Sequence, residues 1–79
     1  MLSARIAAVF SEVLRISPGS INDQTSPENT PQWDSLAVVT LVTAIEDEFG
    51  VTLSTREIMS MRSIALVRKV LLEKGVADA

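Results

Sequence analysis

The chain has 79 residues and a mass near 8.5 kDa, which is the size of one small domain, and we expect residues 1–79 to form it. Seven basic and ten acidic residues give a net charge of −3, which argues against a nucleic-acid partner, and a hydrophobic share of 47% excludes a disordered acidic segment. Cysteine, histidine and tyrosine are absent, so we expect no disulfide, no metal site and no catalytic residues of a free-standing hydrolase or oxidoreductase.

Apolar residues at helical spacing predict a first helix near the N-terminus, ended by Pro18 and Gly19. The segment that follows, residues 17–33, contains all three prolines and no periodic pattern, so it is predicted to be a long loop. Ile21 and Trp33 are the apolar side chains that we expect to anchor this loop. The stripe of the first helix consists of Leu2, Ile6, Val9, Phe10, Val13 and Leu14.

Three further helices are predicted after the loop. The second has an apolar stripe and is followed by Gly50, which suits a left-handed C-cap. Residues 54–57 have the pattern of a capping box and begin a short third helix, and residues 63–74 form the fourth. No alternating strand pattern of useful length is present, so the predicted fold class is all-α, a four-helix bundle with a long first loop and a short third helix. The stripe of the second helix consists of Val38, Leu41, Val42, Ile45 and Phe49.

No segment of the sequence has the pattern of a membrane anchor or a secretion signal. The apolar runs are shorter than the ~20 residues that span a bilayer. The N-terminal residues also lack the charged and apolar regions of a signal peptide. We therefore expect a cytoplasmic monomer without a membrane partner.

Asp34 and Ser35 stand where the long loop meets the second helix. Asp34 suits the N-cap position, where its carboxylate accepts hydrogen bonds from free amides of the first turn. Ser35 lacks both a Gly-x-Ser-x-Gly elbow and a histidine to deprotonate it, so it is not a catalytic serine. Free N–H groups and the helix dipole nevertheless favour a phosphate on a first-turn hydroxyl, which makes Ser35 a candidate for modification by another enzyme.

The run Trp33-Asp34-Ser35-Leu36, followed by the acidic and apolar stretch at residues 44–51, resembles the acyl carrier proteins. The resemblance covers nearly the whole chain, including the helix order and the proline-bearing loop. It implies a carrier, not an enzyme, with a 4′-phosphopantetheine arm from coenzyme A on Ser35, attached by a phosphopantetheinyl transferase that uses magnesium. It also implies that the arm's terminal thiol holds acyl groups as thioesters and that partner enzymes read Asp34.

The resemblance further implies a docking strip for partner enzymes on the second helix, and a position near the arm for Met61 in the third. The partners implied are acyl synthetases, ketosynthases and acyltransferases with basic docking surfaces. Met59 and Met61 are two residues apart and cannot share a helix face, so we expect one of them to be exposed. The docking strip consists of Leu36, Val39, Thr43, Glu46 and Asp47.

Charge is unevenly distributed along the chain. Residues 16–55 contain six acidic residues and no basic residue. Glu46, Asp47 and Glu48 lie near the predicted C-terminus of the second helix, where negative charges oppose the helix dipole. The charge distribution alone fits a solvated acidic face that serves solubility, whereas the placement of these three residues favours partner binding over stability as their role.

Several positions depart from the pattern of fatty-acid carriers. Ala37 and Thr40 stand where those carriers often have acidic residues, and Arg56 and Arg62 flank a third helix that is usually acidic. We therefore expect an acyl carrier of fatty-acid or polyketide type without assigning it to the housekeeping pathway. An aminoacyl or peptidyl carrier is one alternative, although residues 31–33 lack the Gly-Gly pair usual there. A helical interaction module without a prosthetic group is the other.

Overall fold

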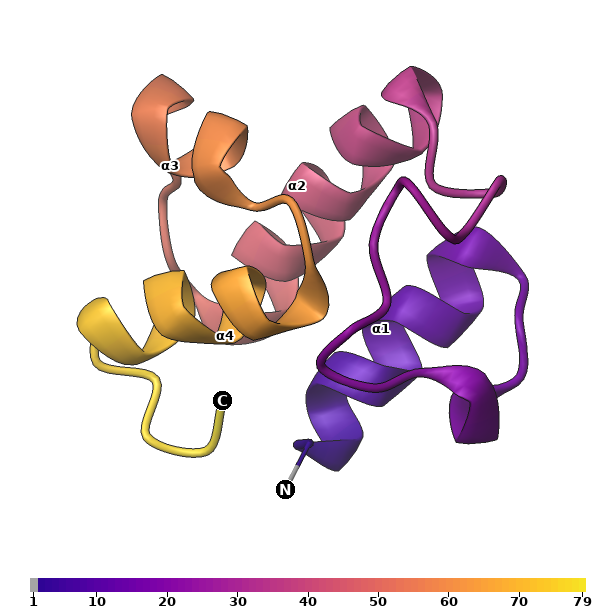
Figure 1. Ribbon diagram of the computed structural model, residues 1–79. Coiled ribbons are helices and arrows are strands. Elements are labelled where there is room, and N and C mark those ends of the chain that lie inside the picture. The colour runs from indigo at the N-terminus through magenta and orange to yellow at the C-terminus, as the bar shows by residue number, and fades with distance from the viewer. Residues whose placement is uncertain (1) are drawn as a thin grey trace.

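The computed structural model describes residues 2–79 and, within them, contains four α-helices, one 3₁₀ turn and no β-strand (Figure 1). This confirms the predicted all-α fold with a long first connection and a short third helix. α1 packs against α2, and α3 packs against α4. None of the helices in residues 2–79 has the length and apolar character needed to cross a membrane. The elements are α1 (Ala4–Leu14), η1 (Pro18–Ser20), α2 (Ser35–Phe49), α3 (Thr55–Ser60) and α4 (Ile64–Glu73).

Side-chain oxygen atoms cap the first turns of all four α-helices. The predicted capping box of α3 is present: Ser54 Oγ accepts a hydrogen bond from Glu57 N at 3.1 Å, and Glu57 Oε1 accepts one from Ser54 N at 2.9 Å. Such caps satisfy amides that have no partner inside the helix. The helix starts are therefore encoded locally in the sequence. The four capping residues are Ser3, Asp34, Ser54 and Ser63.

α1 ends before the predicted stop at Pro18. Its last residue is Leu14, and Arg15 takes a left-handed conformation with φ 58°. Ser11 stabilises this turn, because its Oγ donates to the Ile16 carbonyl at 2.6 Å and its carbonyl accepts from Ile16 N at 3.3 Å. A non-glycine residue at positive φ is uncommon, which is why the sequence did not predict this C-cap. Gly50, the predicted left-handed cap of α2, has φ 65° as expected.

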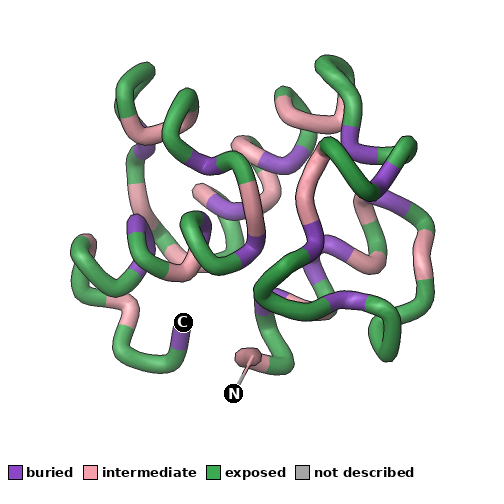
Figure 2. Tube along the Cα trace, viewed as in Figure 1, coloured by how far each residue is buried: buried purple, intermediate pink, exposed green. Residues whose placement is uncertain are grey.

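The α1–α2 connection, residues 15–34, contributes directly to the hydrophobic core. Trp33 is 4% exposed and packs against Phe10 of α1, with ring centroids 5.2 Å apart. Ile21 is also buried, so both predicted anchors of the connection are confirmed. Figure 2 shows buried positions in this connection as well as on the inner faces of the helices.

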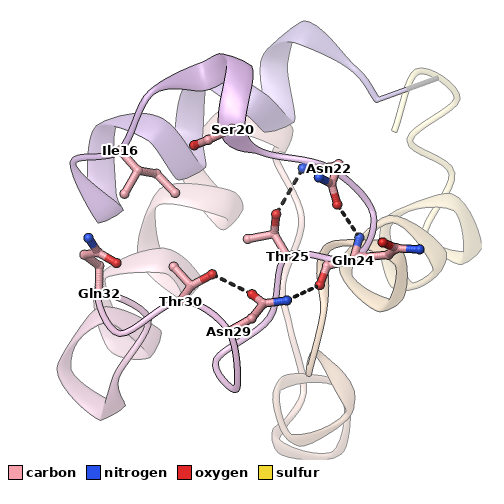
Figure 3. A pocket seen from close by; sticks show the side chains of 8 residues that line it. All are labelled: Ile16, Ser20, Asn22, Gln24, Thr25, Asn29, Thr30 and Gln32. Atoms are coloured by element: carbon pink, nitrogen blue, oxygen red, sulfur yellow. Dashed lines mark hydrogen bonds between the residues drawn. The ribbon is translucent and has the colours of Figure 1, made fainter.

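Polar side chains hold the connection in place of regular secondary structure (Figure 3). Thr25 Oγ1 accepts from Asn22 N at 3.0 Å, and Asn22 Oδ1 accepts from Gln24 N at 2.8 Å. Asn29 Nδ2 donates to the Gln24 carbonyl at 2.9 Å, and Asn29 Oδ1 accepts from Thr30 Oγ1 at 2.8 Å. These bonds surround a polar hollow of about 390 Å³. The predicted loop is therefore ordered, and it also contains the 3₁₀ turn η1.

The connection also binds the N-terminus of α4. The amides of Ile64 and Ala65 donate to the carbonyl oxygens of Thr25 and Asp23 at 2.9 and 3.0 Å. Arg68 Nη1 donates to both carboxylate oxygens of Asp23 at 2.8 and 2.9 Å. Residues about forty positions before α4 in the chain thus complete the cap that Ser63 begins, and these bonds fix the connection relative to the bundle.

Substituting Trp33 by alanine will strongly destabilise the fold. Large-to-small replacement of a buried aromatic side chain costs about 3–5 kcal/mol, which is a large part of the stability of a small domain. Urea unfolding followed by far-UV circular dichroism measures the loss, because the substitution removes the chain's only tryptophan as a fluorescent probe. Trp33→Phe keeps a ring against Phe10 and is expected to lose less. Equal stability of Trp33→Ala and the wild type would contradict the role of Trp33 as the anchor.

Candidate functional site

Ser35 is the first residue of α2, and its side chain is exposed. Asp34 caps the helix as predicted: its Oδ1 accepts from Ala37 N at 2.9 Å, and its carbonyl accepts from Val38 N at 3.0 Å. The amides of Ser35 and Leu36 have no hydrogen-bond acceptor within residues 2–79. An exposed hydroxyl therefore lies at the positive end of a 15-residue helix, beside two unpaired N–H groups. This turn can accommodate a phosphate ester on Ser35.

Ser35 opens onto a surface hollow of about 330 Å³, which we call the Ser35 hollow. Its walls come from the end of the α1–α2 connection, the first turn of α2, and α3 with the residues that follow it. Most of the lining is apolar, and the charged side chains in it are one acid and one base. The lining residues are Pro27, Trp33, Asp34, Ser35, Val38, Ile58, Met59, Met61 and Arg62.

The protein interior next to the Ser35 hollow is filled. Trp33, Val38, Ile58 and Met61 line both this hollow and a gap in the core whose volume is only about 10 Å³. Such a gap holds no more than about one water molecule. These four side chains therefore separate the hollow from the core, and an acyl chain would reach the interior only by displacing some of them.

α3 is the least buried wall of the Ser35 hollow. No residue of this six-residue helix is buried, and Ile58 is half-buried. Elements with few buried apolar contacts open at low free-energy cost. Met61, with its flexible thioether side chain, adjoins the same wall. α3 is thus the element that can move most easily beside Ser35.

The predicted docking strip lies on an exposed face of α2 for most of its length. Leu36 is 80% exposed and Val39 is 65% exposed, and Thr43 and Asp47 are exposed as well. Large apolar side chains with this exposure, directly after Ser35, do not contribute to the core. Their exposure agrees with the sequence-based expectation, while their role in binding stays a prediction.

The two methionines differ as their spacing predicted. Met61 is 9% exposed and is the C-cap residue directly after α3, not a residue within the helix. Met59 is 72% exposed and lies in α3. Both line the Ser35 hollow, while a position of Met61 near the arm stays a prediction.

Two of the three carboxylates at the end of α2 have partners within the chain. Glu46 Oε2 accepts from Leu53 N at 2.8 Å, which ties α2 to the segment before α3. Glu48 pairs with Arg5 Nε of α1 at 3.1 Å, and its carbonyl accepts from Arg5 Nη2 at 2.7 Å. Arg5 thus offsets the unfavourable interaction between the Glu48 carboxylate and the negative C-terminal end of the α2 dipole. Glu46 and Glu48 therefore have contacts within the chain that sequence reasoning did not predict, while Asp47 is exposed and forms no ion pair within residues 2–79, and the role of this acidic cluster in partner binding stays a prediction.

Sequence reasoning missed that five further residues line the Ser35 hollow. Arg62 was noted only as a departure from a family pattern, yet it borders the hollow and lies 3.8 Å from Glu28 of the α1–α2 connection. No local signal could reveal this arrangement, because the lining comes from separate segments at residues 27, 33–38 and 58–62. The other missed residues are Pro27, Val38, Ile58 and Met59.

Glu57 fastens α3 to α4 as well as closing its own capping box. The Ser54 backbone N–H and the Lys74 ammonium, 2.9 Å from Glu57 Oε1, hold the pKa of Glu57 below its ordinary value of 4.5. Ionised Glu57 therefore stabilises the fold. This contribution is complete above the ordinary pKa and is lost as the pH falls through the lower pKa of the folded state.

Replacing Glu57 by glutamine is expected to flatten the dependence of stability on pH in acid. The difference in unfolding midpoint between the wild type and Glu57→Gln will be largest above pH 4.5 and will shrink as the pH falls. Urea unfolding at a series of pH values measures it. Glu12→Gln, at an exposed position of α1, is the control. A difference that stays constant with pH would contradict the ionised role of Glu57.

Comparison with known families matches this chain over residues 4–70. The matching family model is described as a phosphopantetheine attachment site. The match spans all of α1, α2 and α3 and the greater part of α4, and it includes every residue that lines the Ser35 hollow.

Proposed function

Because the chain belongs to the phosphopantetheine-attachment family, we propose that Ser35 carries the 4′-phosphopantetheine arm and that the protein is an acyl carrier of fatty-acid or polyketide type. Members of this family carry the arm covalently, so the chain is a carrier of a prosthetic group and not itself a catalyst. The observation that supports Ser35 is its position: an exposed hydroxyl in the first turn of α2, beside unpaired amides and at the edge of an apolar hollow.

A comparison with the other serine residues also favours Ser35 as the attachment site, because most of their hydroxyls form hydrogen bonds to the backbone. Within residues 2–79 the hydroxyl of Ser35 forms no hydrogen bond, so it is available for modification. Ser17 is also exposed, but it precedes η1 and does not line the hollow. The Ser26 hydroxyl likewise forms no hydrogen bond within residues 2–79, but Ser26 is half-buried and does not line the hollow. Serine hydroxyls that are bonded to the backbone, and so are poorer candidates, are those of Ser3, Ser11, Ser20, Ser54, Ser60 and Ser63.

The residues around Ser35 fit a phosphodiester at this position. The α2 dipole and the unpaired amides of Ser35 and Leu36 stabilise negative charge there. Asp34 keeps the first turn helical by capping Ala37. When attached, the arm supplies a flexible chain that ends in a thiol, which forms thioesters with acyl groups. The chain itself supplies the anchoring oxygen and the surface that partners meet.

Carrier proteins of this family work with partner enzymes. We infer that a phosphopantetheinyl transferase and then acyl synthetases, ketosynthases or acyltransferases dock on α2. The exposed Leu36 and Val39 support an apolar contact next to Ser35. The exposed acids Asp34 and Asp47 support basic groups on the partner surface. Acyl cargo is favoured over aminoacyl cargo because residues 31–33 lack the Gly-Gly pair of peptidyl carriers.

Intact mass measurement tests the attachment site. The purified apo chain is incubated with coenzyme A, magnesium and a broad-specificity phosphopantetheinyl transferase. We expect the wild type to gain one phosphopantetheine and Ser35→Ala to gain none, with the same far-UV circular dichroism spectrum. Ser17→Ala, which removes another exposed hydroxyl, is the control and will be modified like the wild type. Addition to Ser35→Ala, or none to the folded wild type, would overturn the proposal.

Attaching a medium-length acyl group to the arm is expected to raise the melting temperature. Each buried methylene contributes about 0.8 kcal/mol to the stability of the folded state. The free-energy cost of displacing side chains such as Met61 reduces this gain. A net gain of about 1 kcal/mol raises the melting temperature of a domain of this size by about 4–8 °C. Thermal unfolding of the holo, acetyl and octanoyl forms measures the change. Equal melting temperatures for all three would show that the interior does not shelter the acyl chain.

A further inference from the structure

Arg62 is the cation that lines the Ser35 hollow, and its present partner holds it weakly. It follows the C-cap of α3, and its Nη2 lies 3.8 Å from Glu28 Oε2 in the α1–α2 connection. Both side chains are mostly exposed, at 72% and 61%. Exposed ion pairs contribute little to stability because water screens them. The guanidinium can therefore exchange this carboxylate for another anion at low cost.

A phosphodiester on Ser35 would place a new negative charge among acidic side chains. Asp34 precedes Ser35 and lines the same hollow, and the Glu28 carboxylate lies beside Arg62. Like charges at short range repel, so the new anion needs a cation. Within residues 2–79, Arg62 is the basic residue in the lining of the Ser35 hollow. A planar guanidinium also matches the oxygen geometry of a phosphate.

We propose that Arg62 binds the phosphodiester of the arm on Ser35, giving up Glu28, and so holds the root of the arm against the α3 side of the hollow. This inference rests on the proposed attachment at Ser35. A bond to Arg62 would set the direction in which the arm leaves Ser35. With its root held toward Arg62, the arm lies beside Met59 and Met61, which line the same hollow in and directly after α3, its least buried wall. Arg62 is thus a positioning residue for the arm.

The test uses the full chain in apo and holo forms, with one arm per molecule verified by intact mass. Nuclear magnetic resonance follows the Nε–Hε group of Arg62 and the phosphorus of the phosphodiester. We expect the Arg62 resonance to shift on attachment and its Hε to exchange more slowly with water. The phosphorus shift of Arg62→Gln will differ from that of the wild type, and this difference will shrink as salt is added.

Arg56→Gln is the matched control, because Arg56 is an exposed arginine of α3 that does not line the hollow. Its holo form should give the wild-type phosphorus shift. Arg62→Lys keeps the charge but not the planar fork, and we expect an intermediate shift. Far-UV circular dichroism verifies that each variant is folded.

The outcomes separate the two proposals. A holo wild type with an unchanged Arg62 resonance, and with the same phosphorus shift as Arg62→Gln, would overturn the role of Arg62 and leave attachment at Ser35 intact. An equal change of the phosphorus shift in Arg56→Gln would show that the shift reports general surface charge, and it would also overturn the role of Arg62. Failure of the folded wild type to accept the arm would overturn the proposed function, and this inference with it. The comparison of apo and holo wild type needs no variant, so it stands even if a substitution slows modification.

Discussion

The binding of the α1–α2 connection to the first turn of α4 is the constraint on which the rest of the structure depends. Two backbone carbonyls, of Asp23 and Thr25, accept hydrogen bonds from the free amides at the start of α4, and the Asp23 carboxylate pairs with Arg68. A helix start without such partners would leave buried polar groups unsatisfied. The connection thus stabilises α4. The bonds to α4 in turn offset the conformational entropy that the connection loses on ordering.

The position of Ser35 follows from this constraint. The connection passes through its hydrogen-bonded polar turns and then buries Trp33 against Phe10. Ser35 begins α2 two residues later, so the buried position of Trp33 fixes Ser35 at the edge of the hollow. Trp33, which precedes Asp34 in the chain, is buried in the core, whereas Ser35 and Leu36, which follow Asp34, are exposed. Ser35 therefore lies beside α3, the least buried helix, and a carrier whose cargo enters the interior would need such an element next to the arm.

The charges around Ser35 are mixed, as the few acidic residues of the predicted docking strip suggest. Glu46 and Glu48 hold α2 to neighbouring segments, and the first turns of the docking strip are apolar or hydroxylic. Arg62 adds a positive charge to the lining of the hollow. A partner that docks near Ser35 would therefore meet an apolar surface that carries both an acid and a base. Electrostatic patterns of this kind set orientation and specificity more than affinity.

The sequence by itself determined the features that depend on neighbours three or four residues away. The apolar stripes, the caps at Asp34 and Ser54, and the left-handed Gly50 are local, because helical hydrogen bonds and caps span one turn. The buried Trp33 followed from an apolar residue in a polar loop. The tertiary structure alone decided that Arg15 would take a left-handed conformation and that Glu46 would bond to Leu53 N. It also decided that Arg62 would share a hollow with Ser35. Ser35 and Arg62 lie in segments far apart in the chain, so their proximity depends on how the whole chain packs, and no local pattern encodes it. Arg15 and Glu46 bond within a few residues of the chain, but their residue types do not by themselves predict these bonds.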